Sequence, residues 1–332
     1  MNASAEPDAR AVAARDWAFQ HLQLQAASFA PASADASFRR YFRIEDGARS
    51  WVLMDAPPER EDCAPFVRVA QLLLDAGLHG PRVLAQDLER GFLLLSDLGR
   101  RTFLHAVTVD NADNADALMS DAIDALIRWQ LASRPGVLPP YDAALLQREL
   151  SLFPDWYVAR HLRTSLTSAQ AATMARIDAL LIDSALAQPR VYVHRDYMPR
   201  NLMISTPNPG ILDFQDAVEG PLAYDVVSLF KDAFLSWPAE RVIAWRGLYA
   251  ERARRAGLPL PDAATFARQF DWMGVQRHLK VIGIFARIHY RDGKPHYLAD
   301  VPGFIGYVRD VASRYDELAP LLGLFDELGM PA

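Results

Sequence analysis

The chain has 332 residues, of which 51% are hydrophobic and 23% charged, a composition typical of a globular protein with one large domain or two lobes. The formal net charge of −6 gives no general attraction to nucleic acid or to an anionic membrane, so we expect neither as a partner. The single cysteine, Cys63, excludes an internal disulfide and a thiolate-rich zinc site, and it fits a reducing compartment.

The first residues, MNASAEPDARAVAARDW, are rich in charge and lack the apolar stretch of a secretory signal. Apolar runs elsewhere, such as residues 92–95 and 281–286, are too short to span a bilayer. We therefore expect a cytoplasmic protein.

Residues 25–98 have the pattern of a small β-rich lobe that follows an N-terminal helix. Two apolar and aromatic runs flank the turn signal EDG at 45–47, which predicts a hairpin. Asp62 is expected to cap a helix that ends at Gly77, because apolar residues recur between them at helical spacing. The run FLLL at 92–95 then predicts a buried strand.

The rest of the chain has the apolar periodicity of helices. The predicted helices cover residues 114–133, 143–162, 168–187, 221–236, 239–256, 262–290 and 301–316. Pro154 is expected to kink the second of them. Residues 190–214 interrupt this pattern with short strand-like runs around the loop HRDYMPR and the turn TPNPG.

The loop in this interruption resembles the catalytic loop of kinases, H-R-D-x-x-x-x-N. It reads His194-Arg195-Asp196, with Asn201 five residues after the aspartate. Asp213-Phe214 stands where the metal-binding Asp-Phe-Gly of kinases begins, although the next residue is glutamine. The resemblance implies an α+β fold of the protein-kinase-like, bilobal kind. Residues 1–97 would form the N-terminal nucleotide-binding lobe, and residues 98–332 the helical lobe with the catalytic loop and substrate site.

No long activation segment follows Asp213, which favours the aminoglycoside-phosphotransferase branch of this superfamily, whose members phosphorylate small hydroxylated molecules. Within that branch the chain resembles the bacterial anomeric kinases for N-acetylmuramate and N-acetylglucosamine. The stretches that carry this resemblance are ADASFRRYFRI, SWVLMDAPPERED, LLLSDLG, HRDYMPRNLM, GILDFQDAVEGPLAYDVVSL and LKVIGIFARIHYRDGKPHYLAD.

Phosphoryl transfer requires an oriented acceptor hydroxyl and cations on the phosphates. The carboxylate of Asp196 is expected to accept a hydrogen bond from the acceptor hydroxyl, and Asn201 and Asp213 offer hard oxygen ligands for Mg²⁺. His194 is interpreted as a structural anchor of the loop. Asp225, on the following helix, is expected to tie down the loop's backbone.

Asp216 is left with three roles from sequence alone: a metal ligand, a substrate contact, or a solvated side chain.

The small lobe departs from the kinase pattern, because kinases hold the α- and β-phosphates with a lysine on the third strand, paired with a helix glutamate. Here that strand reads SWVLMD and has no lysine. Small residues in the preceding turn, including Ser37, can still let backbone N–H groups approach a phosphate. Arg40 or Arg43 is expected to replace the lysine, but strand alternation cannot choose between them, and a solvated role for all the arginines of FRRYFR stays open.

The resemblance also assigns adenine contacts. The backbone of Leu94, Leu95 and Ser96 falls where the superfamily binds the adenine ring.

The last long helix carries a basic stripe that includes Arg277, Lys280 and Arg287. A stripe lining the substrate site would disfavour a polycationic aminoglycoside and would suit the lactyl carboxylate of N-acetylmuramate. The alternative is a solvated basic face.

Together these features predict a sugar kinase that uses ATP and Mg²⁺ to phosphorylate the C1 hydroxyl of N-acetylmuramate and N-acetylglucosamine in peptidoglycan recycling. We expect a monomer whose partners are small molecules. Two alternatives remain: a kinase for another hydroxyl acceptor, and a nucleotide-binding pseudokinase that acts as a regulator.

Overall fold

The computed structural model describes residues 8–33, 38–107, 112–232 and 234–331. It divides into two compact units. The first comprises residues 1–102 and 202–216, and the second comprises residues 103–201 and 217–332.

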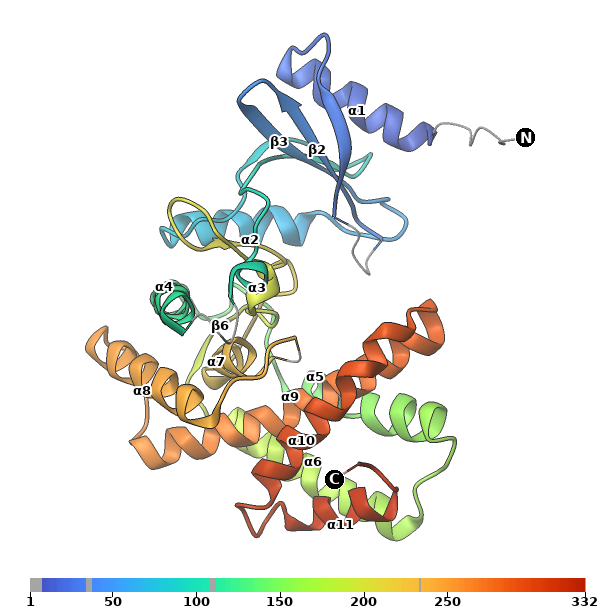
Figure 1. Ribbon diagram of the computed structural model, residues 1–332, viewed down its shortest axis with the longest axis vertical. Coiled ribbons are helices and arrows are strands. Elements are labelled where there is room, and N and C mark those ends of the chain that lie inside the picture. Colours follow the sequence, from blue (N-terminus) through green and yellow to red (C-terminus); the bar gives the residue numbers. More distant parts are fainter. Residues whose placement is uncertain (1–7, 34–37, 108–111, 233, 332) are drawn as a thin grey trace. The chain divides into compact units, whose positions relative to one another are not determined.

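The first unit is built around a five-stranded antiparallel sheet with the strand order β1-β2-β3-β5-β4 (Figure 1). Its strands are β1 (Ser28–Ser33), β2 (Arg40–Asp46), β3 (Arg49–Asp55), β4 (Val83–Asp87) and β5 (Phe92–Ser96). The predicted hairpin is confirmed as β2–β3, and Gly47 in its turn has φ +61°, a conformation that glycine adopts without strain.

One face of this sheet is covered by the N-terminal helix α1 (Ala9–Leu22). Trp17, Ala14 and Ala18 of the helix are buried with Phe42 and Leu53 of the sheet, so an apolar core lies between these two layers.

The helix α2 (Ala64–Asp75) confirms the helix predicted before Gly77, but its start differs. Cys63 is the capping residue rather than Asp62, although Asp62 Oδ1 still accepts a hydrogen bond from Ala64 N at 2.8 Å. Gly77 follows the helix with φ +69°, as expected of a residue that ends it.

A small hairpin from later in the chain also belongs to the first unit. It consists of β7 (Leu202–Met203) and β8 (Gly210–Ile211). Ile211 N donates to His79 O at 2.8 Å, and Ile204 N donates to Arg101 O at 2.8 Å. These bonds explain why residues 202–216 group with the first unit, whereas the sequence predicts a single boundary after residue 97.

The second unit is mainly helical. It contains α3 (Phe103–Ala106), α4 (Ala112–Leu131), α5 (Ala143–Leu150), the π-helix η1 (Phe153–His161), α6 (Ser168–Leu186), η2 (Pro199–Asn201), α7 (Ala223–Phe230), α8 (Ala239–Arg255), α9 (Ala263–Asp292), η3 (Pro295–Asp300), α10 (Val301–Ala312) and α11 (Ala319–Glu327). The helix predicted over 143–162 is divided into α5 and η1 just before Pro154, and α7 ends earlier than the predicted residue 236.

Features of this unit that were not predicted include α11 and the pairing of β6 (Arg190–Val193) with β9 (Val218–Pro221). The long helix α9 contacts η1, α6, α7 and α10, so it forms the centre of the helical packing. Within the described ranges, no helix has the length and apolarity needed to cross a membrane.

Candidate active site

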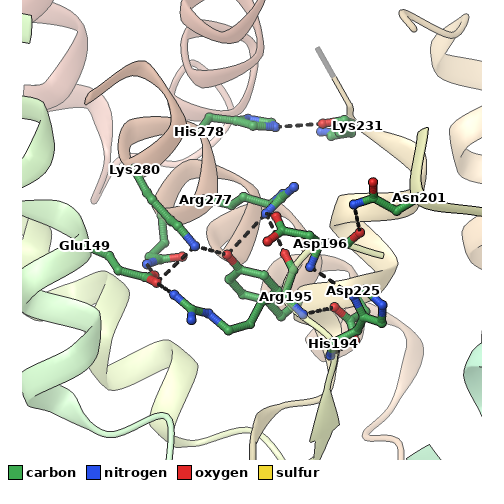
Figure 2. A network of polar contacts seen from close by, with 12 residues as sticks. Glu149, His194, Arg195, Asp196, Asn201, Asp225, Lys231, Arg277, His278 and Lys280 are labelled. Carbon is green, nitrogen blue, oxygen red and sulfur yellow. Dashed lines mark hydrogen bonds and ion pairs between the residues drawn. The ribbon is translucent and has the colours of Figure 1, made fainter. Parts of the chain in front are cut away.

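The loop that resembles a kinase catalytic loop begins at the end of the buried strand β6 and is fixed by a carboxylate from α7. Asp225 Oδ2 accepts a hydrogen bond from His194 N at 2.6 Å, and Oδ1 accepts one from Arg195 N at 3.0 Å (Figure 2). This is the contact that the sequence predicts for Asp225. Arg195 has φ +76°, so the loop turns sharply at the residue before Asp196.

Asp225 is completely buried. Burial raises the pKa of Asp225 to about 7, although the two backbone hydrogen bonds from the loop act to lower it. The ionised carboxylate is the stronger acceptor of both bonds, because protonation turns one of its oxygens into a hydroxyl.

Asp196 belongs to this anchored loop. Its backbone is held on both sides, because Asp196 N donates to His194 Nδ1 at 3.3 Å and Asp196 O accepts from Asn201 Nδ2 at 2.9 Å. Its side chain remains 38% exposed. The arrangement presents a carboxylate to solvent on a backbone with little freedom, as a group that orients a substrate hydroxyl requires.

A buried arginine from α9 lies next to this loop. Arg277 Nη1 donates to Arg195 O at 3.0 Å and to Tyr224 Oη at 3.2 Å, and it lies 3.9 Å from Asp196 Oδ1 (Figure 2). Arg277 therefore links the loop's backbone to α7 and places a positive charge beside the candidate catalytic carboxylate.

A second buried cluster centres on Glu149 of α5. Its carboxylate pairs with the Arg195 guanidinium and with Lys280 Nζ, the latter at 3.0 Å, and Gln276 Nε2 donates to it at 3.3 Å. Burial alone raises the pKa of Glu149, but Lys280 and Arg195 outweigh it and lower that pKa to about 2. Tyr224 Oη also accepts from Lys280 Nζ at 2.9 Å, so one hydroxyl joins this cluster to Arg277.

Glu149 was not identified from the sequence. The available signal was its place between Leu146 and Leu150 on the buried face of α5, since a carboxylate on such a face needs a cationic partner.

The basic stripe of α9 is divided by the structure. Arg277 and Lys280 are only 4% and 5% exposed, so the alternative of a solvated face is wrong for these two residues. Arg287 is half-buried and, ten residues further along the helix, stands about 15 Å beyond Arg277. The structure does not bring Arg287 into the Arg277–Glu149 network.

In the first unit, both arginines predicted to replace the lysine have carboxylate partners. Arg40 pairs with Asp55 and Asp8, and Arg43 pairs with Asp97 with an Nε–Oδ2 distance of 2.7 Å. Ser37 lies outside the described residues.

The three predicted adenine contacts lie in β5, an interior strand of the sheet between β3 and β4. Leu94 and Leu95 are paired with residues on both sides, and Ser96 N donates to Arg82 O at 2.9 Å. Their backbone contact with adenine stays a prediction.

The two candidate magnesium ligands belong to different units, Asn201 to the second and Asp213 to the first. The Asn201 amide donates through Nδ2, so its ligand atom would be Oδ1. Asp213 has φ +62°, and its carboxylate accepts from Gln215 Nε2 at 2.9 Å. An amide oxygen and a carboxylate are donors that suit Mg²⁺, so the residue types fit this ion.

The exposed Asp216 lies in the first unit. In the described ranges, no three His, Cys, Asp or Glu side chains gather into a possible metal site.

Three relatives with known names match nearly the whole chain. Each is called N-acetylmuramate/N-acetylglucosamine kinase. The protein from Pseudomonas aeruginosa is 61% identical over 89% of this chain and 87% of its own length. The one from Pseudomonas putida is 59% identical over 92% and 90%, and the one from Neisseria meningitidis is 50% identical over 90% and 89%.

Solved structures with much lower identity have the same fold. An ethanolamine kinase from Plasmodium vivax matches with a TM-score of 0.63 at 9% identity, over 86% of this chain and 83% of its own. The ADP-bound aminoglycoside phosphotransferase APH(2'')-Ib matches with a TM-score of 0.58 at 14% identity, over 88% and 97%. These matches confirm the predicted kinase-like fold.

The family model described as "Phosphotransferase enzyme family" matches residues 28–265, which include both the five-stranded sheet and the anchored loop. The chain therefore belongs to the phosphotransferase enzyme family, and it is a phosphotransferase.

Proposed function

We propose that this phosphotransferase is an ATP-dependent sugar kinase that phosphorylates the anomeric hydroxyl of N-acetylmuramate and N-acetylglucosamine. The names of the three relatives at 50–61% identity support these acceptors. The observation that carries the chemistry is the exposed carboxylate of Asp196 on a loop fixed by buried Asp225.

In the proposed reaction, Asp196 accepts a hydrogen bond from the C1 hydroxyl of the sugar and directs its oxygen toward the γ-phosphate. An anomeric hydroxyl is more acidic than an ordinary alcohol, so an aspartate is a sufficient acceptor for its proton. Asp225 and Arg277 keep the loop in one conformation, which reduces the entropy that must be lost in reaching the transition state.

We further propose Asn201 and Asp213 as the residues that would hold Mg²⁺. When bound, this ion neutralises charge on the phosphates of ATP. Sugar 1-phosphates of this kind are intermediates that a cell recovering its own wall material would form, so we assign the enzyme to peptidoglycan recycling in the cytoplasm. We expect a monomer.

The proposal is tested by incubating the protein with ATP, Mg²⁺ and one acceptor at a time. The acceptors are N-acetylmuramate, N-acetylglucosamine and a control set containing choline, ethanolamine and an aminoglycoside. Phosphorus NMR distinguishes a sugar 1-phosphate from a phosphate on any other hydroxyl. We expect the 1-phosphate from both amino sugars, and product from only a control acceptor would contradict the assignment.

The alternative that the missing third-strand lysine suggested, a nucleotide-binding pseudokinase, conflicts with the place of the chain among the phosphotransferases. That candidate predicts measurable ATP binding and no phosphorylated product with any acceptor. The same incubation, combined with a titration of ATP, therefore separates the two functions.

A further inference from the structure

The first unit lacks both members of the ion pair with which kinases hold ATP phosphates. No lysine occurs in residues 1–102 or 202–216, and the helix α2, with the sequence APFVRVAQLLLD, contains no glutamate. If this unit holds the phosphates through a side-chain cation, that cation is therefore an arginine. The register of the sheet indicates which one.

By the resemblance to kinases, the missing lysine would stand near Met54 on β3, and the cross-strand partner of Met54 on β2 is Tyr41. Residues directly opposite each other on antiparallel strands share a face of the sheet. Because side chains alternate along a strand, Arg43 lies on the Met54 face and Arg40 lies on the other. Arg39 directly precedes β2, and the same alternation extended by one residue assigns it to the Met54 face.

The opposite face is the one covered by α1. Arg40 is paired in register with Asp55, which is buried, and its guanidinium contacts both Asp55 and Asp8, the capping residue of α1. Arg10 of α1 also pairs with Asp55, at 2.7 Å. Arg40 thus helps to attach α1 to the sheet.

Arg43 is on the Met54 face, but its guanidinium donates hydrogen bonds to Asp97 and to a backbone carbonyl. Nε donates to Asp97 Oδ2 at 2.7 Å, while Nη2 donates to Asp97 Oδ1 at 2.9 Å and to Gly99 O at 2.6 Å. This is a bidentate pair with an added carbonyl contact, which fixes the chain after β5.

The remaining arginine on this face, Arg39, makes a different kind of pair. Its Nη2 lies 2.9 Å from Oε2 of Glu61, which stands in the segment leading into α2. The two side chains are 13% and 15% exposed, so the pair is partly shielded from water but still accessible. Arg39 just before β2 and Glu61 just before α2 form a pair of the same charge types as the missing lysine and glutamate.

We propose that Arg39, oriented by Glu61, is the residue that binds the phosphates of the nucleotide in place of the third-strand lysine. A guanidinium carries five N–H donors in a fixed fork, and this fork matches a phosphate through two parallel hydrogen bonds. This inference rests on the proposed function, because it assumes that the nucleotide is ATP.

The test compares the affinities of the full-length protein for ATP and for adenosine by isothermal titration calorimetry in buffer with Mg²⁺. Adenosine has no phosphate, so it reports the integrity of the rest of the nucleotide site. For Arg39→Met we expect ATP affinity to fall by about tenfold or more with adenosine affinity unchanged, and for Arg39→Lys a smaller loss because the charge is retained. Glu61→Gln should weaken ATP binding by about threefold, because Arg39 loses the group that orients it.

The matched control is Arg49→Met in β3 of the same hairpin, whose exposed guanidinium pairs with Asp46; it should leave both affinities unchanged. The inference is overturned if Arg39→Met leaves ATP affinity unchanged, or if it weakens ATP and adenosine equally. It is also overturned if the selective loss appears in Arg43→Met and not in Arg39→Met.

These titrations need no acceptor sugar, so their outcome is separable from that of the proposed function. A selective loss in Arg39→Met without any sugar phosphate would uphold the phosphate contact and reject the sugar kinase. A wild-type protein that binds no ATP would overturn both.

Discussion

Arg195 and Asp213 hold backbone conformations that are costly for residues with a side chain. Each has a positive φ, whereas the other non-glycine residues with positive φ in the described ranges, Gln23 and Arg163, stand just beyond helix ends. Such conformations cost about 1–3 kcal/mol and persist where the surroundings enforce them. For Arg195 the enforcing contacts are identified: Asp225 holds its N–H, and Arg277 holds its C=O.

Glu149 is expected to be a positioning residue for the loop through Arg195. Glu149→Gln leaves the buried Lys280 and the partly buried Arg195 without their counter-charge, so the free energy of unfolding should fall by about 3–5 kcal/mol. The kcat should fall by about tenfold while the KM for ATP changes little, since a small misplacement of a catalytic group slows the chemical step. Urea unfolding and steady-state kinetics measure the two effects.

The matched control for this prediction is Asp178→Asn, which removes a carboxylate of α6 that is also buried. Burial raises the pKa of Asp178, and its contact is the neutral Gln147, so losing its charge should change stability by less than about 1 kcal/mol. Equal effects of the two substitutions on kcat would show that Glu149 has no specific role.

Asp225 should make both stability and kcat depend on pH, and the two should change in opposite directions. Its pKa rises from 3.8 to about 7 on folding, so the folded chain binds the proton more tightly, and stability decreases as pH is raised between these values. The ionised carboxylate holds His194 N and Arg195 N more strongly than the protonated form does, so kcat should increase over the same range.

The measurement is kcat and urea stability at about pH 5 and about pH 8 for the wild type and for Asp225→Asn, which cannot titrate. The decrease in stability with pH should be smaller in the variant. A wild-type kcat that is higher at the lower pH would contradict the role given to the ionised form.

At the scale of single elements, α9 depends on close contact with the segment between α5 and η1. A Cβ at Gly283 would lie 2.3 Å from Leu152 C and 2.4 Å from Leu152 O, and backbone atoms cannot move aside cheaply. Gly283→Ala should therefore destabilise the protein by at least about 2 kcal/mol, despite alanine's better helix propensity.

In α10, Gly306 has open space around it, so Gly306→Ala should be neutral or stabilising by up to about 1 kcal/mol. Thermal unfolding of the two variants tests this contrast.

Arg287, further along α9, is the residue on which the hypothesis of lactyl recognition now depends. Its Nε is buried without a hydrogen-bond partner, and burial lowers its pKa, so an added carboxylate would be favourable there. Arg287→Ala should raise the KM for N-acetylmuramate by about tenfold and leave that for N-acetylglucosamine unchanged. The exposed Arg291, paired with Asp292, supplies the control Arg291→Ala. Equal effects of Arg287→Ala on both sugars would reject the hypothesis.

The elements show why local features could be predicted and distant pairings could not. The β2–β3 hairpin and the stop at Gly77 depend on residues close together in the chain, so sequence alone identified them. The pairing of β6 with β9 depends on strands separated by the whole loop and the β7–β8 hairpin. The role of Glu149 also depends on a distant contact, because its partner Arg195 lies 46 residues away, and so it was not predicted.

For the whole molecule, the division into a β-rich and a helical part, together with the motif from His194 to Asp213 and the resemblance it carries, predicted the fold and the phosphotransferase family. The motif does not indicate which carboxylates pair with the buried or partly buried arginines. Sequence alternation separated Arg39 and Arg43 from Arg40, but only the structure supplies their carboxylate partners.

Asp196→Ala tests most directly whether Asp196 orients the sugar hydroxyl for phosphoryl transfer. The rate of sugar 1-phosphate formation is followed by phosphorus NMR, and ATP affinity is measured by calorimetry on the same preparation. Transfer should fall by about 10²–10⁴-fold, the usual contribution of a positioned acid–base group, with ATP affinity unchanged within about twofold. Turnover close to that of the wild type would contradict the account.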